Sequence, residues 1–267
     1  MIPASRFNLF LPITFVWTLL QHFFHATLAP HVPKAIISPS SSSSSSSSPI
    51  AIVTGSNTGI GLATARRLSS YGYTVIIACR DATKGAAAAS LIPNAIFIKP
   101  LDLSSLQSVR EFAKAVLSHH QAIAVLVNNA GMNSFNNAGS TVDGHERTYK
   151  VNFLGHFLLT NLLLAHVTRV VNLSSVMHHF GGDLRTASDW TRAATAPNPN
   201  AYADAKLAAI LLTLEINRRT KGRVRSIAVN PGAVNSDIWR SIVLNHPTLY
   251  KFVVSEADAR SQEVRRG

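Results

Sequence analysis

The chain reads Ile50-Ala51-Ile52-Val53-Thr54-Gly55-Ser56-Asn57-Thr58-Gly59-Ile60-Gly61 directly after a run of serines and a proline. The first five of these residues are mostly apolar and β-branched, which is typical of a strand buried on both faces of a sheet. The residues that follow place Leu62, Ala65 and Leu68 on one side of a helix. A strand, a glycine-rich turn and a helix start together predict a binding site for an anionic group.

The three glycines of this turn have separate roles in such a site. Gly55 permits the tight turn, Gly59 lets a pyrophosphate approach the backbone, and Gly61 lets the helix pack closely on the strand. The residues between them complete the predicted cofactor-binding turn, namely Asn57, Thr58 and Ile60. The alternative is an ordinary glycine-rich turn that binds nothing.

Apolar strands and amphipathic helices alternate along the rest of the chain. We expect strands at residues 73–78, 95–98, 123–127, 168–173 and 224–229, and helices at residues 82–91, 104–120, 145–164 and 203–216. This alternation predicts an α/β fold with a parallel sheet and helices on both faces. Ligands of such sheets bind beyond the carboxyl ends of the strands, where the strand order reverses.

Composition excludes several classes of protein. The 267 residues and 28.8 kDa leave room for one α/β domain, and 46% apolar against 14% charged residues excludes wholesale disorder. A single cysteine, Cys79, excludes an internal disulfide framework, and no metal site is expected. The net charge of +12 arises from scarce acids without a basic stripe interleaved with aromatics. No nucleic acid is therefore expected, although association with RNA or a membrane through this charge is an alternative.

The N-terminus differs from the rest of the chain. Residues 7–29 carry no charged side chain, and an unbroken serine run covers Ser40 to Ser48. We expect an apolar anchor or targeting segment at 1–37, a Ser-rich linker at 38–48 and the folded domain at 49–267. The segment 7–29 would then attach the protein to a membrane, as an endoplasmic reticulum-type anchor, or direct it to an organelle. A segment without any targeting role is the remaining alternative.

Charged residues follow the second and third strands. An NAD site carries an acidic residue after the second strand, whereas this chain has Arg80 there. A cation at that position fits a 2′-phosphate, which favours NADP over NAD. Asp81 comes next and could cap the following helix. Asp102, after the third strand, could bind the amino group of an adenine or cap the helix that follows it.

Polar residues also follow the fourth and fifth strands. The motif Asn128-Asn129-Ala130-Gly131 could lie beside an adenine or ribose, with Asn128, Ala130 and Gly131 as the candidate contacts. The Ser175 hydroxyl could donate to a substrate carbonyl as it gains negative charge, or simply form a turn with Ser174. Asn152 lowers helix propensity in the middle of a predicted helix. A water bound near Lys206 would explain it, and hydrogen bonding along the helix is the alternative.

Tyr202 and Lys206 are four residues apart on a predicted helix and so share one face. A phenol has a pKa of about 10, and a neighbouring ammonium favours the phenolate and lowers that pKa. The same lysine could hydrogen-bond the ribose of a nicotinamide cofactor. By itself this spacing also occurs on ordinary helices.

Taken together, these motifs carry a family resemblance that covers roughly residues 49–240. The order of Thr54-Gly55-x-x-x-Gly59-Ile60-Gly61, Asn128-Asn129-Ala130-Gly131, Asn152, Ser175, Tyr202-x-x-x-Lys206 and Pro231-Gly232 resembles that of the short-chain dehydrogenases/reductases. The segments Ala78-Cys79-Arg80-Asp81 and Ser174-Ser175-Val176-Met177-His178-His179 resemble the retinol dehydrogenase-like branch.

The resemblance implies a doubly wound, Rossmann-type sheet and an NADP-dependent oxidoreductase that interconverts a carbonyl and an alcohol on a lipophilic small molecule. It implies that Tyr202 is the general acid or base, that Lys206 tunes Tyr202 and binds the ribose, and that Ser175 orients the substrate oxygen. Asn152 would hold a proton-relay water. The nicotinamide carboxamide would be lined by Pro231, Gly232, Val234 and Ser236.

The C-terminus departs from the family pattern. The chain ends at Gly267, so we expect the last strand of the sheet to be missing. This expectation leaves the oligomeric state open. It also gives an alternative function, namely a non-catalytic NADP-binding interaction module or a truncated, inactive family member.

Overall fold

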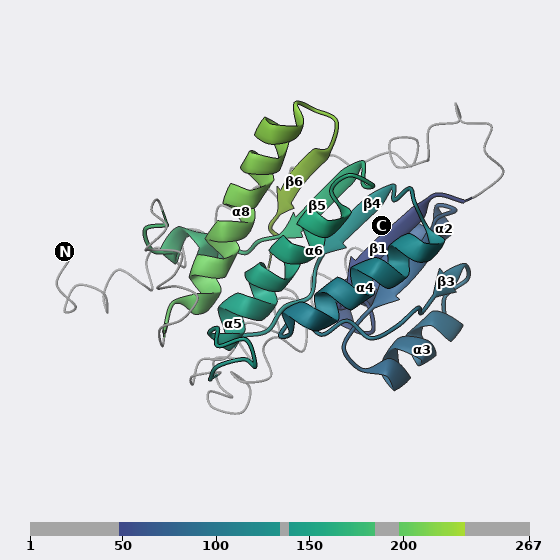
Figure 1. The fold of residues 1–267 in the computed structure, drawn as a ribbon, viewed down its shortest axis with the longest axis horizontal. Coiled ribbons are helices and arrows are strands. Elements are labelled where there is room, and N and C mark those ends of the chain that lie inside the picture. The colour runs from purple at the N-terminus through teal and green to yellow at the C-terminus, as the bar shows by residue number, and fades with distance from the viewer. Residues whose placement is uncertain (1–47, 134–138, 185–197, 233–267) are drawn as a thin grey trace, which may run out of the picture. The chain divides into compact units, whose positions relative to one another are not determined.

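The computed structural model describes residues 48–133, 139–184 and 198–232, all within the compact unit that spans residues 42–267. In this part of the chain six parallel strands form one sheet in the order β3-β2-β1-β4-β5-β6 (Figure 1). The strands are β1 (Ile50–Thr54), β2 (Thr74–Ala78), β3 (Ala95–Ile96), β4 (Val125–Asn128), β5 (Arg169–Leu173) and β6 (Arg225–Val229). The strand order reverses between β1 and β4, which is the doubly wound arrangement, so the predicted Rossmann-type α/β fold is confirmed.

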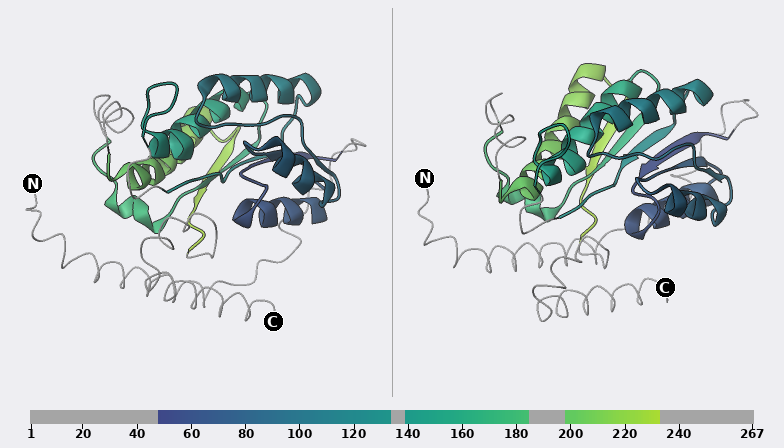
Figure 2. Two further views of the ribbon diagram at one scale, coloured as in Figure 1. Left: turned by 90° about the horizontal axis from the view of Figure 1, so that it is seen from below. Right: turned by 60° about the horizontal axis from the view of Figure 1, so that its bottom comes forward.

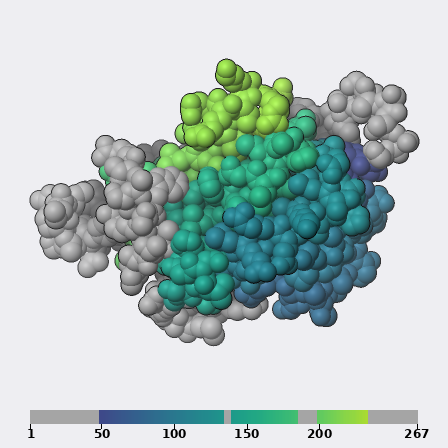
Figure 3. All heavy atoms as spheres, viewed as in Figure 1, coloured from purple at the N-terminus to yellow at the C-terminus, as the bar shows by residue number. Residues whose placement is uncertain are grey.

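Helices cover both faces of the sheet (Figures 1 and 2). Helices α2 (Gly59–Ser70) and α3 (Ala82–Ser90) pack on one face, and α4 (Leu106–His119), α6 (Gly155–Leu163) and α8 (Ala201–Thr220) on the other. Figure 3 shows residues of α4, α6 and α8 covering the second face. Shorter elements are α5 (Arg147–Tyr149), the π turn η3 (Lys150–Leu154) and the 3-10 turn η4 (Val176–Phe180).

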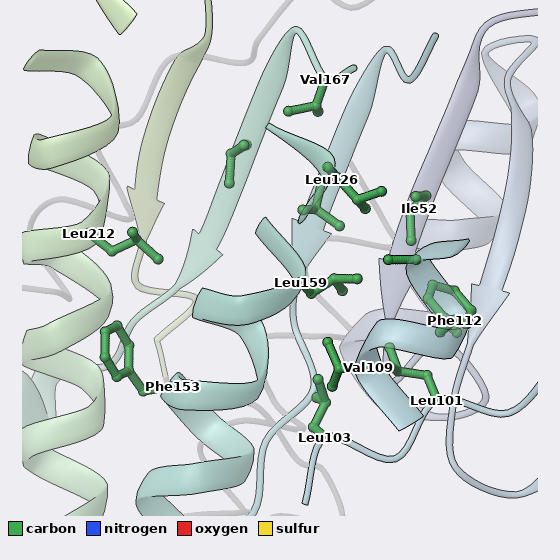
Figure 4. Close-up of a cluster of buried hydrophobic side chains, with 14 of the residues drawn as sticks. Ile52, Leu101, Leu103, Val109, Phe112, Leu126, Phe153, Leu159, Val167 and Leu212 are labelled. Atoms are coloured by element: carbon green, nitrogen blue, oxygen red, sulfur yellow. The ribbon is translucent and has the colours of Figure 1, made fainter. Parts of the chain in front are cut away.

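The core has two halves because successive strand residues point to opposite faces of the sheet. Ile52 and Leu126 belong to the cluster beneath α4, α6 and α8, where Figure 4 shows them facing Phe112 and Leu159 of the helices. Val53, which follows Ile52 on β1, belongs to the cluster beneath α2 and α3. Burial on both faces explains why the strands are apolar runs rather than alternating sequences.

The element boundaries differ from the prediction in a few places. Strand β3 has two residues instead of four, because its pairing with β2 ends at Ile96. The N–H of Leu101 then donates to the carbonyl of Cys79, the residue after β2. The predicted helix 145–164 is interrupted by the π turn η3, and α8 continues to Thr220. The turn η4, which begins directly after Ser175, was not predicted.

Some predictions fall outside the described residues. These are the N-terminal segment and the linker up to residue 47, the missing last strand, and the contacts of Val234 and Ser236. Within the described ranges, no helix is both long and apolar enough to cross a membrane.

Candidate active site

The predicted site residues gather at the carboxyl edge of the sheet. Strand β1 ends at Thr54, β4 ends at Asn128, and β5 ends at Leu173, directly before Ser174 and Ser175. Because these three strands are parallel neighbours, their carboxyl ends lie at the same edge, beside the point where the strand order reverses. The fold therefore brings the glycine turn, the Asn-Asn-Ala-Gly loop and the serine pair together.

The glycine turn is packed too tightly for side chains. A Cβ atom added at Gly61 would lie 2.4 Å from the carbonyl oxygen of Gly55 and 2.5 Å from Nδ2 of Asn129. Gly55 and Gly59 have φ angles of +66° and +54°, a region that favours glycine. The exposed Gly59 starts helix α2, whose first turn contains no acidic residue. Free helical N–H groups without a nearby carboxylate fit a pyrophosphate.

The Asn-Asn-Ala-Gly loop is fixed to the end of β1. The Thr54 hydroxyl oxygen accepts hydrogen bonds from the backbone N–H groups of Asn129 and Ala130, both at 2.9 Å. Nδ2 of Asn129 donates to the carbonyl of Thr54 at 2.6 Å. Sequence reasoning missed this role of Thr54, although the residue lies within a motif that it selected.

Asn128 stays a predicted cofactor contact, and the structure shows which groups its side chain binds inside the protein. Its side chain is buried, and its Nδ2 donates to Oγ1 of Thr160 at 2.9 Å and to Oδ1 of Asn172 at 2.8 Å. The amide therefore joins β4 to α6 and β5 inside the protein. Ala130 is half-buried and Gly131 is exposed, so both remain available to a ligand.

The acidic and basic residues after β2 and β3 have different surroundings. Asp81 is the N-cap of helix α3, as the sequence suggested, and its side chain accepts the N–H of Lys84 at 2.9 Å. Arg80 is exposed and has no hydrogen bond or ion pair within the described part of the chain. Oδ1 of Asp102 accepts the N–H and the hydroxyl of Ser104 at 2.9 and 2.7 Å, while Ser105 is the N-cap of α4.

The structure brings Tyr202, Ser175 and Lys206 together. The side chain of Ser175 lies close enough to Tyr202 to lower its pKa. Nζ of Lys206 lies 5.4 Å from the centre of the Tyr202 ring and donates to the carbonyl of Leu173 at 2.8 Å. Tyr202 and Lys206 therefore lie on the same face of α8, as predicted. The hydrogen bond from Lys206 also connects α8 to the end of β5.

Burial controls the protonation of both side chains. It raises the pKa of Tyr202, against the contact with Ser175, which lowers it. Burial also lowers the pKa of Lys206, to about 8. The predicted lowering of the Tyr202 pKa is therefore not found, because the loss of water around the phenol outweighs the contact with Ser175. Tyr202 is protonated at neutral pH, as a proton donor must be.

Asn152 lies in the π turn η3, which interrupts the predicted long helix. Its Oδ1 accepts the N–H of Met132 at 2.8 Å and its Nδ2 donates to the carbonyl of the same residue at 2.7 Å. This paired contact explains an asparagine inside a helix, and it holds the chain just after Gly131. π turns of this kind are frequent at functional sites.

Asp204 was not predicted to have a role, although it lies between Tyr202 and Lys206. It is buried, and its two carboxylate oxygens accept the N–H of Gly182 at 2.6 Å and Nδ2 of Asn198 at 2.7 Å. The carboxylate thus holds the chain that follows η4 against the start of α8. Because Ser175 is the N-cap of η4 and α8 carries Tyr202, Asp204 helps to fix the separation of these two residues.

The remaining predicted residues follow β6. Pro231 and Gly232 are exposed, and the N–H of Gly232 donates to Oδ1 of Asn230 at 3.1 Å. In the described ranges, no group of three or more His, Cys, Asp or Glu side chains could hold a metal ion.

Comparison with known proteins identifies the family. The family model described as short chain dehydrogenase matches residues 49–246. The chain is a short-chain dehydrogenase. It is 42% identical to human retinol dehydrogenase 12 over 206 residues, which are 72% of this chain and 63% of the human protein. The predicted resemblance to the retinol dehydrogenase-like branch is confirmed, and this short-chain dehydrogenase spans 63% of the length of that relative.

Two solved structures are similar to this short-chain dehydrogenase. An uncharacterised protein from Mycobacterium paratuberculosis is 39% identical with a TM-score of 0.59, over 70% of this chain and 68% of that one. An alcohol dehydrogenase from the archaeon Thermococcus sibiricus, complexed with 5-hydroxy-NADP, is 25% identical with a TM-score of 0.56, over 71% and 78%.

The buried Lys206 predicts a pH dependence of stability for this short-chain dehydrogenase. Its pKa is about 8 in the folded protein and 10.5, the ordinary value, in the unfolded chain. Between pH 8 and pH 10.5 the unfolded chain therefore binds more protons, so the contribution of Lys206 to the free energy of unfolding rises with pH. We expect a gain of about 3 kcal/mol across this window, lost again as the pH falls through 8.

Denaturant unfolding at several pH values measures this contribution. The difference in the free energy of unfolding between wild type and Lys206→Met isolates the contribution of Lys206, because every other titrating group is common to both proteins. Parallel curves of unfolding free energy against pH for the two proteins would contradict the prediction.

Proposed function

We propose that this short-chain dehydrogenase is an NADP-dependent oxidoreductase that interconverts a carbonyl and an alcohol on a lipophilic small molecule. The observation that carries the proposal is the convergence of Tyr202, Ser175 and Lys206 at the end of β5. Family membership supports the class of reaction. The names of the relatives, retinol dehydrogenases, support a lipophilic substrate.

The hydroxyl groups of Ser175 and Tyr202 would bind the substrate oxygen from two sides. Ser175 would stabilise the negative charge that develops on a carbonyl oxygen during reduction. Tyr202, which is protonated at neutral pH, would donate its proton to that oxygen as a general acid. Lys206, whose Nζ lies 5.4 Å from the centre of the Tyr202 ring, would bind the ribose of the cofactor. In alcohol oxidation the same phenol would act in reverse, as a base.

The residues at the sheet edge fit NADP. The glycine turn leaves no room for side chains next to the N-terminus of α2. Arg80 is exposed without a partner among the described residues, while Asp81 is occupied as a helix cap. Residues that would hold the cofactor are Gly55, Asn57, Thr58, Gly59, Ile60, Gly61, Arg80, Asp102, Ala130, Gly131, Tyr202, Lys206, Pro231 and Gly232. When bound, the nicotinamide supplies or accepts the hydride.

Arg80 gives a prediction about cofactor preference. A charge-assisted hydrogen bond is worth about 1.5–3 kcal/mol. Arg80→Ala should therefore raise the Kd for NADPH by about 10- to 100-fold and leave the Kd for NADH nearly unchanged, as measured by fluorescence titration. Arg110→Ala, which removes an exposed arginine from α4 on the other side of the sheet, is the matched control and should change neither value. An equal loss of affinity for both cofactors would argue against a 2′-phosphate contact.

The reaction itself is tested by NADPH oxidation with the full-length protein and a panel of aldehydes. We expect turnover, with higher kcat/KM for long apolar aldehydes than for short polar ones. NADPH binding without turnover on any aldehyde or on the corresponding alcohols with NADP would contradict the proposal and support a non-catalytic NADP-binding module. We also propose attachment to a membrane through residues 7–29, because that segment carries no charged side chain.

A further inference from the structure

His156 is a buried residue of α6 that joins two parts of the candidate site. Its Nε2 lies 2.8 Å from Oγ1 of Thr54 at the end of β1. Its Nδ1 lies 3.2 Å from the carbonyl oxygen of Asn152 in the π turn. His156 is only 4% exposed, so the ring is buried away from bulk solvent. Both ring nitrogens therefore depend on these two protein partners.

The hydrogen bonds around Thr54 fix the tautomer of the ring. A hydroxyl group has one donor and two acceptor positions. Both acceptor positions of Thr54 are taken by the N–H groups of Asn129 and Ala130. The hydroxyl proton is left for His156, since the only other acceptor within reach among the described residues, the carbonyl of Val127, is farther away at 3.4 Å. Nε2 therefore accepts, and Nδ1 carries the proton that it donates to Asn152.

The surroundings keep the ring neutral. Burial lowers the pKa of His156 to about 4, and the nearby charge of Lys206 acts in the same direction. The hydrogen bond to Asn152 raises the pKa but does not outweigh burial. A protonated ring would present a second donor to a hydroxyl oxygen whose acceptor positions are already used. The charge would also add to that of the buried ammonium nearby.

The partners of His156 hold one loop at two places. Thr54 binds the backbone of Asn129 and Ala130. Asn152 binds the backbone N–H and carbonyl of Met132 through its side chain. Residues 129–132, which include Ala130 and Gly131 of the proposed cofactor site, are thus fixed on both sides, and His156 connects the two residues that fix them.

We propose that His156 is a positioning residue, which as the neutral Nδ1–H tautomer links the Thr54 hydroxyl to the Asn152 carbonyl and thereby sets the conformation of the cofactor loop 129–132. Its expected effect on NADPH affinity rests on the proposed function. The proposed tautomer of His156 does not depend on that function. His156 touches neither substrate nor cofactor and acts only through Thr54 and Asn152.

Three variants separate the two links. His156→Asn keeps an amide where Nδ1 can reach Asn152 but is too short for Thr54. His156→Gln keeps an amide group where Nε2 reaches Thr54 but loses the short link to Asn152. His156→Leu loses both links. We expect the Kd for NADPH of the full-length protein to rise about tenfold in His156→Leu, as for the loss of about one net hydrogen bond, and by less in each partial variant.

The control is His166→Leu. It also removes a histidine whose Nδ1 lies near a carbonyl, that of Gln121 at 3.0 Å, but at the opposite edge of the sheet. This change should leave the Kd for NADPH unaltered. Equal Kd values in wild type and in a folded His156→Leu variant, with folding checked by circular dichroism, would overturn the proposal.

A spectroscopic measurement tests the tautomer without any turnover or cofactor. Long-range ¹⁵N–¹H correlation of the imidazoles, with His156 assigned by its absence in His156→Gln, should show a neutral ring protonated at Nδ1 at pH 7. A ring protonated at Nε2 or at both nitrogens would overturn the proposal. If the wild type binds NADPH without turnover, the proposed function fails while both tests of His156 remain valid.

Discussion

Tyr202→Phe should lower kcat for NADPH-dependent aldehyde reduction by roughly a thousandfold, because general acid catalysis is worth about 10²- to 10⁴-fold. The phenylalanine keeps the ring that lies 5.4 Å from Nζ of Lys206 but removes the hydroxyl group close to Ser175. The packing around α8 should therefore survive, and the Kd for NADPH should rise by no more than about tenfold, as for the loss of one net hydrogen bond. Steady-state kinetics and fluorescence titration on the same preparation measure both quantities.

Tyr71→Phe is the matched control for this experiment. Tyr71 carries a phenol at the end of α2, beneath the guanidinium of Arg67, and lies away from the carboxyl edge of the sheet. The loss of its hydroxyl should leave kcat within about twofold of wild type. If Tyr202→Phe retained as much activity as Tyr71→Phe, Tyr202 would not be the proton donor.

Gly61→Ala should abolish measurable NADPH binding and lower the free energy of unfolding by about 3 kcal/mol, at the upper end of the usual cost of overpacking. The added methyl group would lie 2.4 Å from a backbone oxygen, that of Gly55, and 2.5 Å from Nδ2 of Asn129. Backbone atoms cannot rotate away as a flexible side chain can. The glycine turn and the loop at Asn129 must therefore move apart, and both belong to the proposed cofactor site.

Ala63→Val tests whether added bulk on α2 has this effect in general. Ala63 is exposed on the same helix two residues later, so the larger side chain extends into solvent. We expect only the small helix-propensity cost of a β-branched residue, below about 1 kcal/mol, and unchanged NADPH affinity. Denaturant unfolding and titration of all three proteins give the comparison, and a Gly61→Ala protein that binds NADPH as wild type does would contradict the close packing.

Several parts of the site follow from local sequence patterns. Tyr202 and Lys206 share a helix face because they are four residues apart, and this requires only that α8 is a helix. The placement of Ser175 and Arg80 follows in the same way, since each lies two residues after the end of a predicted strand of a parallel sheet. The role of Asp81 as a helix cap could also be predicted, because capping depends on a few neighbouring residues.

Other parts depended on contacts between distant residues. His156 meets Thr54 across 102 positions of sequence, and no spacing rule connects them. Asp204 binds Asn198 close by but also Gly182, 22 residues away. Asn152, in the π turn, binds the backbone of Met132, which lies 20 residues away and which no local pattern connects to it. A signal for such residues would be a polar side chain at a position where the helix pattern predicts burial.

The amino-acid sequence by itself determined the α/β class, the glycine turn at the first strand and the set of side chains at the strand ends, because each depends on periodicity or on adjacency along the chain. Only the tertiary structure decided the inward direction of Asn128, the bridge made by His156 and the balance of pKa values at Tyr202 and Lys206. Those properties depend on burial and on which strands lie side by side, and both arise only when the whole sheet is packed.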